Sequence, residues 1–189
     1  MLKKILVGAA VVIAAFLAFV ATRPAEYTVA RELLVPAPAA VAYAQVADFR
    51  QWKGWSPWEK LDPQMKTTFE GTPGTVGSVY AWTGNKDVGT GKMTLLEARP
   101  AELVRIELAF VEPFASTAEN TMSFRPEGAG TRVRWTMSGV NNFVGKAMCM
   151  LMDMDKMIGK DFEKGLAQLS AVAQAQAAKG SAGAAAPQP

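Results

Sequence analysis

Residues 102–111 read ELVRIELAFV, and their alternating polarity decides the fold. Arg105 and Glu107 fall on one face of an extended chain, in which every second side chain points the same way. The opposite face carries Val104, Ile106, Leu108 and Phe110. Strict alternation of this kind predicts a β-strand with one face buried and the other in water.

Five further segments alternate in the same way and are separated by short turn sequences. They are MKTTFE (65–70), VGSVYAW (76–82), VGTGKMTLLEA (88–98), ASTAENTMSFR (115–125) and TRVRWTMSG (131–139). Turns of hairpin length between neighbours predict an antiparallel meander. The strand EYTVARELLV (26–35) and a short helix, PAAVAYAQVADF (38–49), precede the meander. We therefore expect a curved antiparallel sheet of about seven strands.

Residues 142–174 have helical rather than strand periodicity. Apolar or small residues recur every three or four positions, at Val144, Ala147, Leu151, Met154, Ile158, Phe162, Gly165, Leu169 and Val172. This spacing predicts one long amphipathic helix, which would cover the apolar face of the sheet. A sheet covered by such a helix is an α+β fold.

Residues 48–63, DFRQWKGWSPWEKLDP, place Trp52, Trp55 and Trp58 in a charged loop that glycine and proline interrupt. Tryptophan usually buries most of its ring, so this loop must pack against the domain. What the loop packs against stays open at this point.

The composition excludes several classes of function. The formal charge is +3, of which Lys3 and Lys4 supply two, so the rest of the chain has no basic excess to hold a nucleic acid. Histidine is absent and Cys149 is the single cysteine. These counts exclude histidine-dependent catalysis, an internal disulfide and a cysteine-based zinc site. We expect neither a metal nor a cofactor, and the oligomeric state stays open.

The first 22 residues contain an uninterrupted apolar run, ILVGAAVVIAAFLAFVA (5–21), after a basic start. Such a run just spans a bilayer and predicts an uncleaved single-pass anchor. A cleaved secretory signal is the alternative, although Phe19 would fit poorly before a cut at Ala21. The positive-inside rule keeps Lys3 and Lys4 in the cytoplasm and places the domain on the periplasmic side of the cytoplasmic membrane.

The remaining chain divides into one domain and a tail. The strand and helix patterns extend over residues 26–175. Residues 177–189 consist mainly of alanine, glycine and proline, with little to bury. We expect this tail to be disordered.

Several motifs resemble the membrane-anchored branch of the polyketide cyclase and START-like (SRPBCC) superfamily. They are WKGWSPWEKLDP, VGSVYAWTGN, VGTGKM, PEGAGTRVRW and MIGKDFEKGLAQL, and they cover essentially the whole domain. The resemblance implies a helix-grip (START/Bet v 1-like) fold with a deep apolar cavity between sheet and long helix. The tryptophan loop then either lies over that cavity, with one ring inserted and another at the surface, or only completes the core. It does not select a reaction, because this scaffold serves cyclases, lipid carriers, hormone-binding proteins and co-chaperones.

The expected ligand-binding residues come from the tryptophan loop, the apolar face of the sheet and the methionine-rich start of the long helix. Methionine lines adaptable surfaces well because its side chain is unbranched and polarizable. The set is Trp55, Trp58, Tyr80, Trp82, Met93, Leu95, Phe110, Met122, Trp135, Met137, Leu151 and Met152.

Three functions fit this sequence. The favoured one is a binding domain for an apolar or amphipathic, lipid-like molecule, without catalytic residues. The second is a cyclase-like or dehydratase-like enzyme that uses Tyr80 or a cavity carboxylate. Candidate carboxylates are Asp48, Glu59, Asp62, Glu97, Glu112 and Glu119. The third is an interaction domain whose cavity is filled by side chains.

Overall fold

The computed structural model describes residues 1–151 and 153–184. A helix comes first, followed by a strand, two short helices, six further strands and two helices. In chain order these are α1 (Leu2–Ala21), β1 (Glu26–Val35), α2 (Ala39–Ala47), the 3₁₀ helix η1 (Phe49–Gly54), β2 (Lys66–Glu70), β3 (Val79–Thr83), β4 (Thr90–Arg99), β5 (Leu103–Glu112), β6 (Ser116–Glu127), β7 (Gly130–Val140), α3 (Phe143–Leu151) and α4 (Met154–Ala184).

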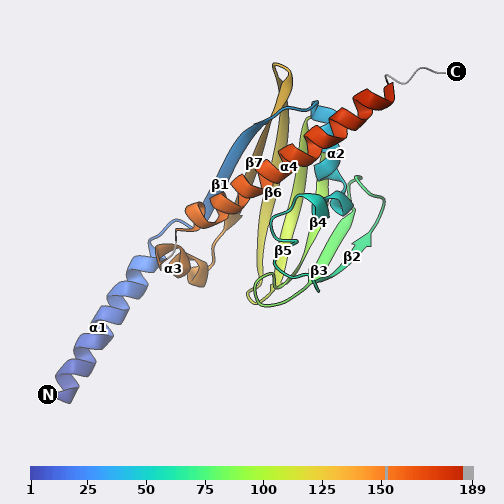
Figure 1. The fold of residues 1–189 in the computed structure, drawn as a ribbon. Coiled ribbons are helices and arrows are strands. Elements are labelled where there is room, and N and C mark those ends of the chain that lie inside the picture. The colour runs from blue at the N-terminus through green and yellow to red at the C-terminus, as the bar shows by residue number, and fades with distance from the viewer. Residues whose placement is uncertain (152, 185–189) are drawn as a thin grey trace.

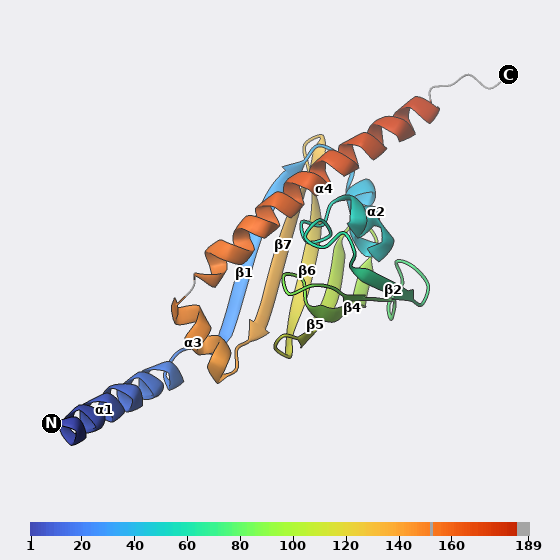
Figure 2. The same cartoon turned by 60° about the horizontal axis from the view of Figure 1, so that its bottom comes forward.

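The strands form one seven-stranded antiparallel sheet in the order β1-β7-β6-β5-β4-β3-β2. Strands β2 to β7 follow one another as a meander, and β1 joins its last member. Helix α4 lies across one face of this sheet, with α2 beside it (Figures 1 and 2). This arrangement is the helix-grip fold, which confirms the expectation from the sequence.

The two faces of the sheet differ as the alternating pattern predicted. Val104 and Ile106 of β5 are buried on the inner face, together with residues of β4, β6 and β7. Arg105, between them, lies on the outer face. There its guanidinium pairs with Glu97 at 3.3 Å and with Glu119 at 3.7 Å. Burial of apolar side chains on one face is the main force that fixes the strand register.

Helix α4 covers the inner face through Phe162, Leu166, Leu169 and Ala173, which are all buried. The ring of Phe162 stacks on Trp135 of β7, with ring centroids 4.1 Å apart and planes 6° from parallel. Gly165 allows this close approach, because a Cβ there would lie 2.8 Å from the Trp135 ring. The stacked pair lies at the contact between helix and sheet.

The single helix predicted over residues 142–174 is two helices, so that prediction was wrong. Helix α3 ends at Leu151 and α4 begins at Met154. The side chain of Asp153 accepts a hydrogen bond from the Lys156 N–H at 2.9 Å and thereby caps the start of α4. Val144, expected to face the sheet, is exposed. At its other end α4 continues to Ala184, into the segment 177–189 that the composition suggested to be disordered.

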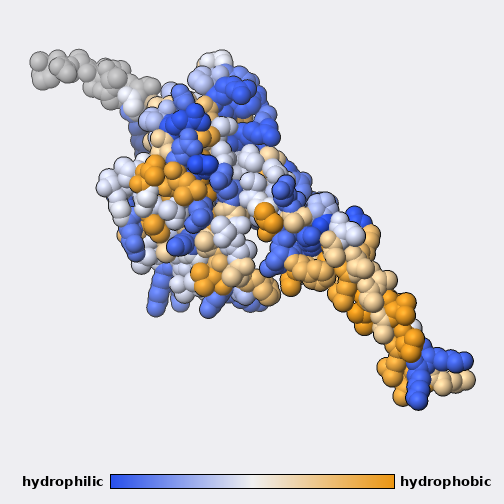
Figure 3. All heavy atoms as spheres, turned by 180° about the vertical axis from the view of Figure 1, so that it is seen from behind, coloured by the Kyte–Doolittle hydropathy of each residue, from blue (hydrophilic) through white to orange (hydrophobic). Residues whose placement is uncertain are grey.

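Helix α1 projects away from the domain and presents an apolar surface along its length (Figures 1 and 3). It is long and apolar enough to cross a membrane, a property shared by anchors and signal sequences. Its last turn contacts the domain. Val20 is fully buried, and the Lys146 ammonium of α3 donates to the Ala21 carbonyl at 3.4 Å.

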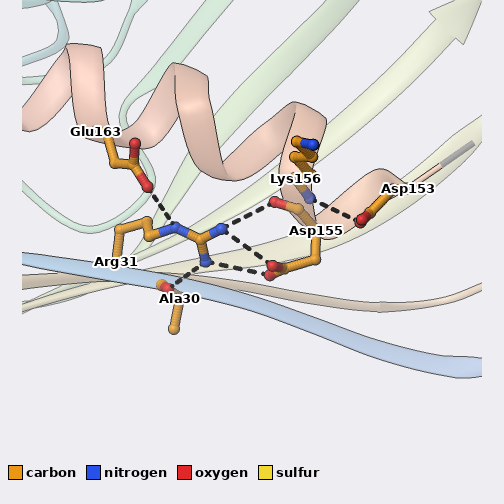
Figure 4. A network of polar contacts seen from close by, with 6 residues as sticks. All are labelled: Ala30, Arg31, Asp153, Asp155, Lys156 and Glu163. Atoms are coloured by element: carbon orange, nitrogen blue, oxygen red, sulfur yellow. Dashed lines mark hydrogen bonds and ion pairs between the residues drawn. The ribbon is translucent and has the colours of Figure 1, made fainter.

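Arg31 of β1 fastens the start of α4 to the sheet (Figure 4). Its guanidinium donates to Glu163 at 2.9 Å and to both carboxylate oxygens of Asp155 at 3.0 and 3.1 Å. The guanidinium occupies the space that a side chain at Gly159 would need, since a Cβ there would lie 1.9 Å from its Nη2. The bond from Arg31 holds the pKa of Asp155 below its ordinary value.

Candidate functional site

A cavity of about 970 Å³ lies between the sheet and the C-terminal helices. Residues of β3 to β7, the tryptophan loop, α3 and the first turns of α4 form its wall. Most of these side chains are aromatic, aliphatic or methionine. The expectation of a cavity filled by side chains therefore does not agree with the structure.

Seven of the twelve residues predicted to bind a ligand line this cavity. They are Trp58, Tyr80, Trp82, Met93, Phe110, Trp135 and Met137. Trp55, Leu95 and Met122 instead belong to the fully buried core and do not line it. Met152 lies outside the described residues, as does the side chain of Leu151.

The tryptophan loop is positioned by the end of α2. Asp48 caps η1 by accepting from the Arg50 N–H at 3.0 Å. The indole of Trp52 then donates to the Val46 carbonyl at 2.8 Å, and that of Trp55 to the Gln45 carbonyl at 2.9 Å. These carbonyls belong to the last turn of α2, where a helix leaves its acceptors without internal partners. The two indoles thus satisfy the helix end and fix the loop.

The structure places the three tryptophans in both of the positions considered from the sequence, the core and the cavity wall. Trp55 is completely buried against Trp52 and Trp135, with centroids 4.6 and 5.6 Å away, and is part of the core. Trp58 is half-buried and lines the cavity. Its ring meets Trp135 and Phe162 edge to face, at 5.8 and 6.4 Å. Trp52 also lines the cavity, although it was not among the twelve predicted ligand-binding residues.

Aromatic rings of β3 and β5 form one wall of the cavity. Tyr80 and Trp82 stack with centroids 5.9 Å apart, and Phe110 meets Trp82 edge to face at 5.7 Å. The Trp82 indole donates to the Val88 carbonyl at 3.0 Å, which restrains the ring. Gly91 leaves room for the ring, because a Cβ there would lie 2.6 Å from it.

The main polar feature of the wall is a pair formed by Tyr80 and Glu59. The Tyr80 hydroxyl donates to Glu59 Oε1 at 2.7 Å. Burial, and then the adjacent carboxylate, raises the pKa of Tyr80 far above its ordinary value, so the phenol stays protonated. Of the candidate carboxylates, only Glu59 lines the cavity; Glu97 and Glu119 form ion pairs on the outer face of the sheet.

Sequence reasoning missed three of the four residues around the cavity mouth; the fourth, Met148, belongs to the methionine-rich segment that was expected to line the cavity. Phe114 in the β5–β6 turn, Val140 at the end of β7, and Val144 and Met148 of α3 all line the cavity while remaining exposed. An exposed phenylalanine in a hairpin turn was the one available signal. Met154 and Met157 also line the cavity, which agrees with the expected methionine-rich wall.

The fold and the site together define a helix-grip domain that encloses an apolar cavity beneath its C-terminal helices. Residues 26–174 match the family model described as polyketide cyclase / dehydrase and lipid transport. Because this match spans most of the chain, the protein belongs to that family.

Solved structures of other proteins share the fold. Protein CV1439 of Chromobacterium violaceum is 16% identical, with 77% of this chain and 96% of that chain covered and a TM-score of 0.54. Major latex-like protein 151 of Panax ginseng is 12% identical, with coverages of 81% and 98% and a TM-score of 0.54. The di-domain ARO/CYC StfQ from the steffimycin biosynthetic pathway is 12% identical, with coverages of 81% and 52% and a TM-score of 0.59. A search of curated proteins found no match.

Proposed function

We propose that this protein is a membrane-anchored binding domain that holds an apolar or amphipathic, lipid-like molecule in its cavity. The observation that carries the proposal is the cavity itself, about 970 Å³ in volume and walled by aromatic and methionine side chains. Ligand pockets commonly measure about 300–1,000 Å³ and bury most of the ligand against apolar side chains. The lipid transport named in the family description supports the same class of ligand.

The charges of the cavity wall favour a neutral or cationic polar group on this ligand. Glu59, Asp87 and Asp161 line the cavity, and none of its described lining residues is lysine or arginine. Tyr80 already donates its hydroxyl proton to Glu59, so the pair presents oxygen acceptors to a ligand. A hydroxyl, amide or ammonium group fits such acceptors, whereas a carboxylate would be repelled.

Helix α1 supports the membrane part of the proposal. Within its most apolar stretch only 6% of the residues are buried, so α1 is not a core helix of the domain. With Lys3 and Lys4 kept in the cytoplasm, the cavity-bearing domain would lie on the periplasmic side of a single-pass protein. Extraction of expressed membranes with alkaline carbonate, followed by mass analysis of the N-terminus, distinguishes an uncleaved anchor from a cleaved signal.

Native mass spectrometry tests the binding function. The full chain, released from a mild detergent, should carry an apolar adduct that organic extraction removes and identifies. Ala118 lines the cavity and is buried, so Ala118→Phe should obstruct part of the space and lower the occupancy of the adduct. Ala109→Phe is the matched control, because Ala109 lies on the outer face of β5. An adduct of equal occupancy in both folded variants would contradict the proposal.

A second candidate function rests on the Glu59 and Tyr80 pair. A carboxylate hydrogen-bonded to a protonated phenol inside an apolar cavity can remove a proton from a carbon acid and stabilise the resulting enolate. This arrangement suits an aldol-type cyclisation or a dehydration. If turnover occurs, extraction should recover a product that differs from the supplied ligand, and Tyr80→Phe should abolish conversion while leaving binding intact.

A further inference from the structure

Helix α3 is held at the end of α1 that faces the domain. The Lys146 ammonium of α3 donates to the Ala21 carbonyl at 3.4 Å, and Val20 is fully buried. The first turn of α3 is also fixed, since Asn142 accepts from the Gly145 N–H at 2.8 Å. The position of α3 is therefore set by where α1 ends.

The cavity mouth lies at the same end of the domain. Val140 pairs with Glu26, the first residue of β1, and the Asn141 N–H donates to the Ala25 carbonyl at 2.7 Å. The β5–β6 turn lies at this end of the sheet too, because Ala118 pairs with Gly139. Figures 1 and 2 show α3 and this turn on the side of the sheet from which α1 extends.

Four apolar side chains, here called the mouth patch, surround this opening. They are Phe114, Val140, Val144 and Met148, with exposed fractions of 71%, 69%, 57% and 41%. Apolar groups gathered at the opening of a cavity, rather than scattered singly, indicate an interaction surface. Figure 3 shows apolar surface continuing from α1 onto the adjoining end of the domain.

The length of α1 sets the height of the mouth patch above a membrane. Its 20 residues span about 30 Å at 1.5 Å per residue, the thickness of a bilayer's hydrocarbon core. With α1 across the bilayer, Ala21 lies at the outer boundary of the hydrocarbon. Arg23, whose guanidinium lies 3.9 Å from the Phe19 ring centroid, and Lys146 then lie at the level of the phosphates.

We propose that α3 and the mouth patch lie in the outer interface of the same bilayer that α1 crosses, so that the cavity opens directly to lipid. This inference rests on the proposed function and specifies it further: the ligand is an amphiphile resident in the membrane, and it enters without crossing water. The amphipathic α3 lies in the plane of the membrane with Val144 and Met148 among the acyl chains. The mouth patch shares its end of the domain with α1, a helix long and apolar enough to cross a membrane, and this identifies the bilayer as its occupant.

Spin-label accessibility in full-length protein tests this placement. The native Cys149 is first replaced by serine, and single cysteines are introduced as Phe114→Cys, Val144→Cys, Leu17→Cys and Leu34→Cys. Leu17 reports on α1, and Leu34 is a control of similar exposure on the outer face of β1 at the far end of the sheet. Each labelled protein is placed in nanodiscs of phosphatidylcholine and phosphatidylglycerol.

Collision with oxygen, which concentrates in lipid, is then compared with collision with an aqueous nickel chelate. We expect the labels at positions 17, 114 and 144 to favour oxygen, and the label at position 34 to favour the chelate. Chelate-accessible labels at 114 and 144, beside a lipid-exposed label at 17, would overturn the inference. Labels at 114 and 144 shielded from both reagents would indicate a protein partner or a second copy, and would also overturn it.

The two proposals fail in different experiments. If the unsubstituted full chain carries no apolar adduct in native mass spectrometry, ligand binding is contradicted, whatever the spin labels report. A chelate-accessible label at position 17 contradicts the anchor and the inference together. A membrane-placed mouth also predicts faster loading from vesicles. Phe143 is an exposed residue of α3 that does not line the cavity. Phe143→Asp should therefore slow uptake of monooleoylglycerol from vesicles by about tenfold and leave the final occupancy unchanged.

Discussion

Replacing Trp55 and Trp58 one at a time by alanine separates the structural role of the tryptophan loop from its binding role. Trp55 is completely buried and donates a hydrogen bond of 2.9 Å to the Gln45 carbonyl. Truncation of a buried aromatic residue costs about 3–5 kcal/mol, which for a protein of this size lowers Tm by about 6–20 °C. Trp55→Ala should therefore lose stability first.

Trp58 has fewer structural contacts. Its half-buried ring makes edge-to-face contacts with Trp135 and Phe162, worth about 0.5–1.5 kcal/mol each beyond burial. Trp58→Ala should cost about 1–3 kcal/mol of stability. Because the ring lines the cavity, the same change should weaken ligand binding by about tenfold.

The assay measures both quantities on the same two variants. Near-ultraviolet circular dichroism gives the melting temperature, and native mass spectrometry gives the occupancy by monooleoylglycerol at several concentrations. The expected result is a large stability loss with near-normal affinity for Trp55→Ala, and the opposite ranking for Trp58→Ala. Unchanged affinity in the folded fraction of Trp58→Ala would refute the assignment of Trp58 to the cavity wall.

Four further predictions follow from the contacts described. Deletion of residues 1–21 should leave a folded domain, checked by a near-ultraviolet spectrum like that of the full chain; loss of that spectrum would mean that α1 is needed for folding. Gly159→Ala should displace the Arg31 guanidinium and cost about 1–3 kcal/mol in a thermal melt, whereas Gly180→Ala, with open space around it, should be neutral or stabilising. Burial raises the pKa of all three tyrosines above 10, so their contribution to stability is present below pH 10 and is lost as the pH rises through the folded-state values; a tyrosine that titrates with a midpoint below pH 10 in the native protein would contradict this. In competition, monooleoylglycerol should displace the bound adduct at lower concentration than oleate, because the described cavity wall offers carboxylates but no lysine or arginine; preferential binding of oleate would be the contrary result.

Alternation along the strands was enough to predict the sheet, its inner face and most of the aromatic wall. Alternation could not show which residues of the inner face lie in the filled core and which lie at the cavity. Leu95 lies on the same face of β4 as Met93, and Met122 pairs with Trp135 on the same face of the sheet. Yet Leu95 and Met122 lie in the filled part of the core rather than at the cavity. Parity identifies the face of a strand, whereas the boundary between core and cavity depends on where α4 and the tryptophan loop cover the sheet.

Other features depended on contacts between distant segments. Glu59 and Tyr80 are 21 residues apart, and only the folded path of the loop brings their oxygens to 2.7 Å. The break before α4 was missed because apolar residues keep their helical spacing across it. Asp153 is a residue type that commonly caps a helix, and it accepts from the Lys156 N–H. The continuous apolar spacing nevertheless favoured a single helix.

The break between α3 and α4 separates the α3 part of the cavity wall from the packed core. Arg31 ties α4 to the sheet at Asp155, two residues after the capping Asp153, so the long helix is fastened from its first turn. Only the nine residues of α3 lie on the other side of the break, attached to α1. If these elements formed one rigid rod, admitting a ligand would require lifting Phe162 away from Trp135. With the break in place, a displacement of α3 would leave the stacked Phe162 and Trp135 rings in contact, because α4 is tied to the sheet independently of α3.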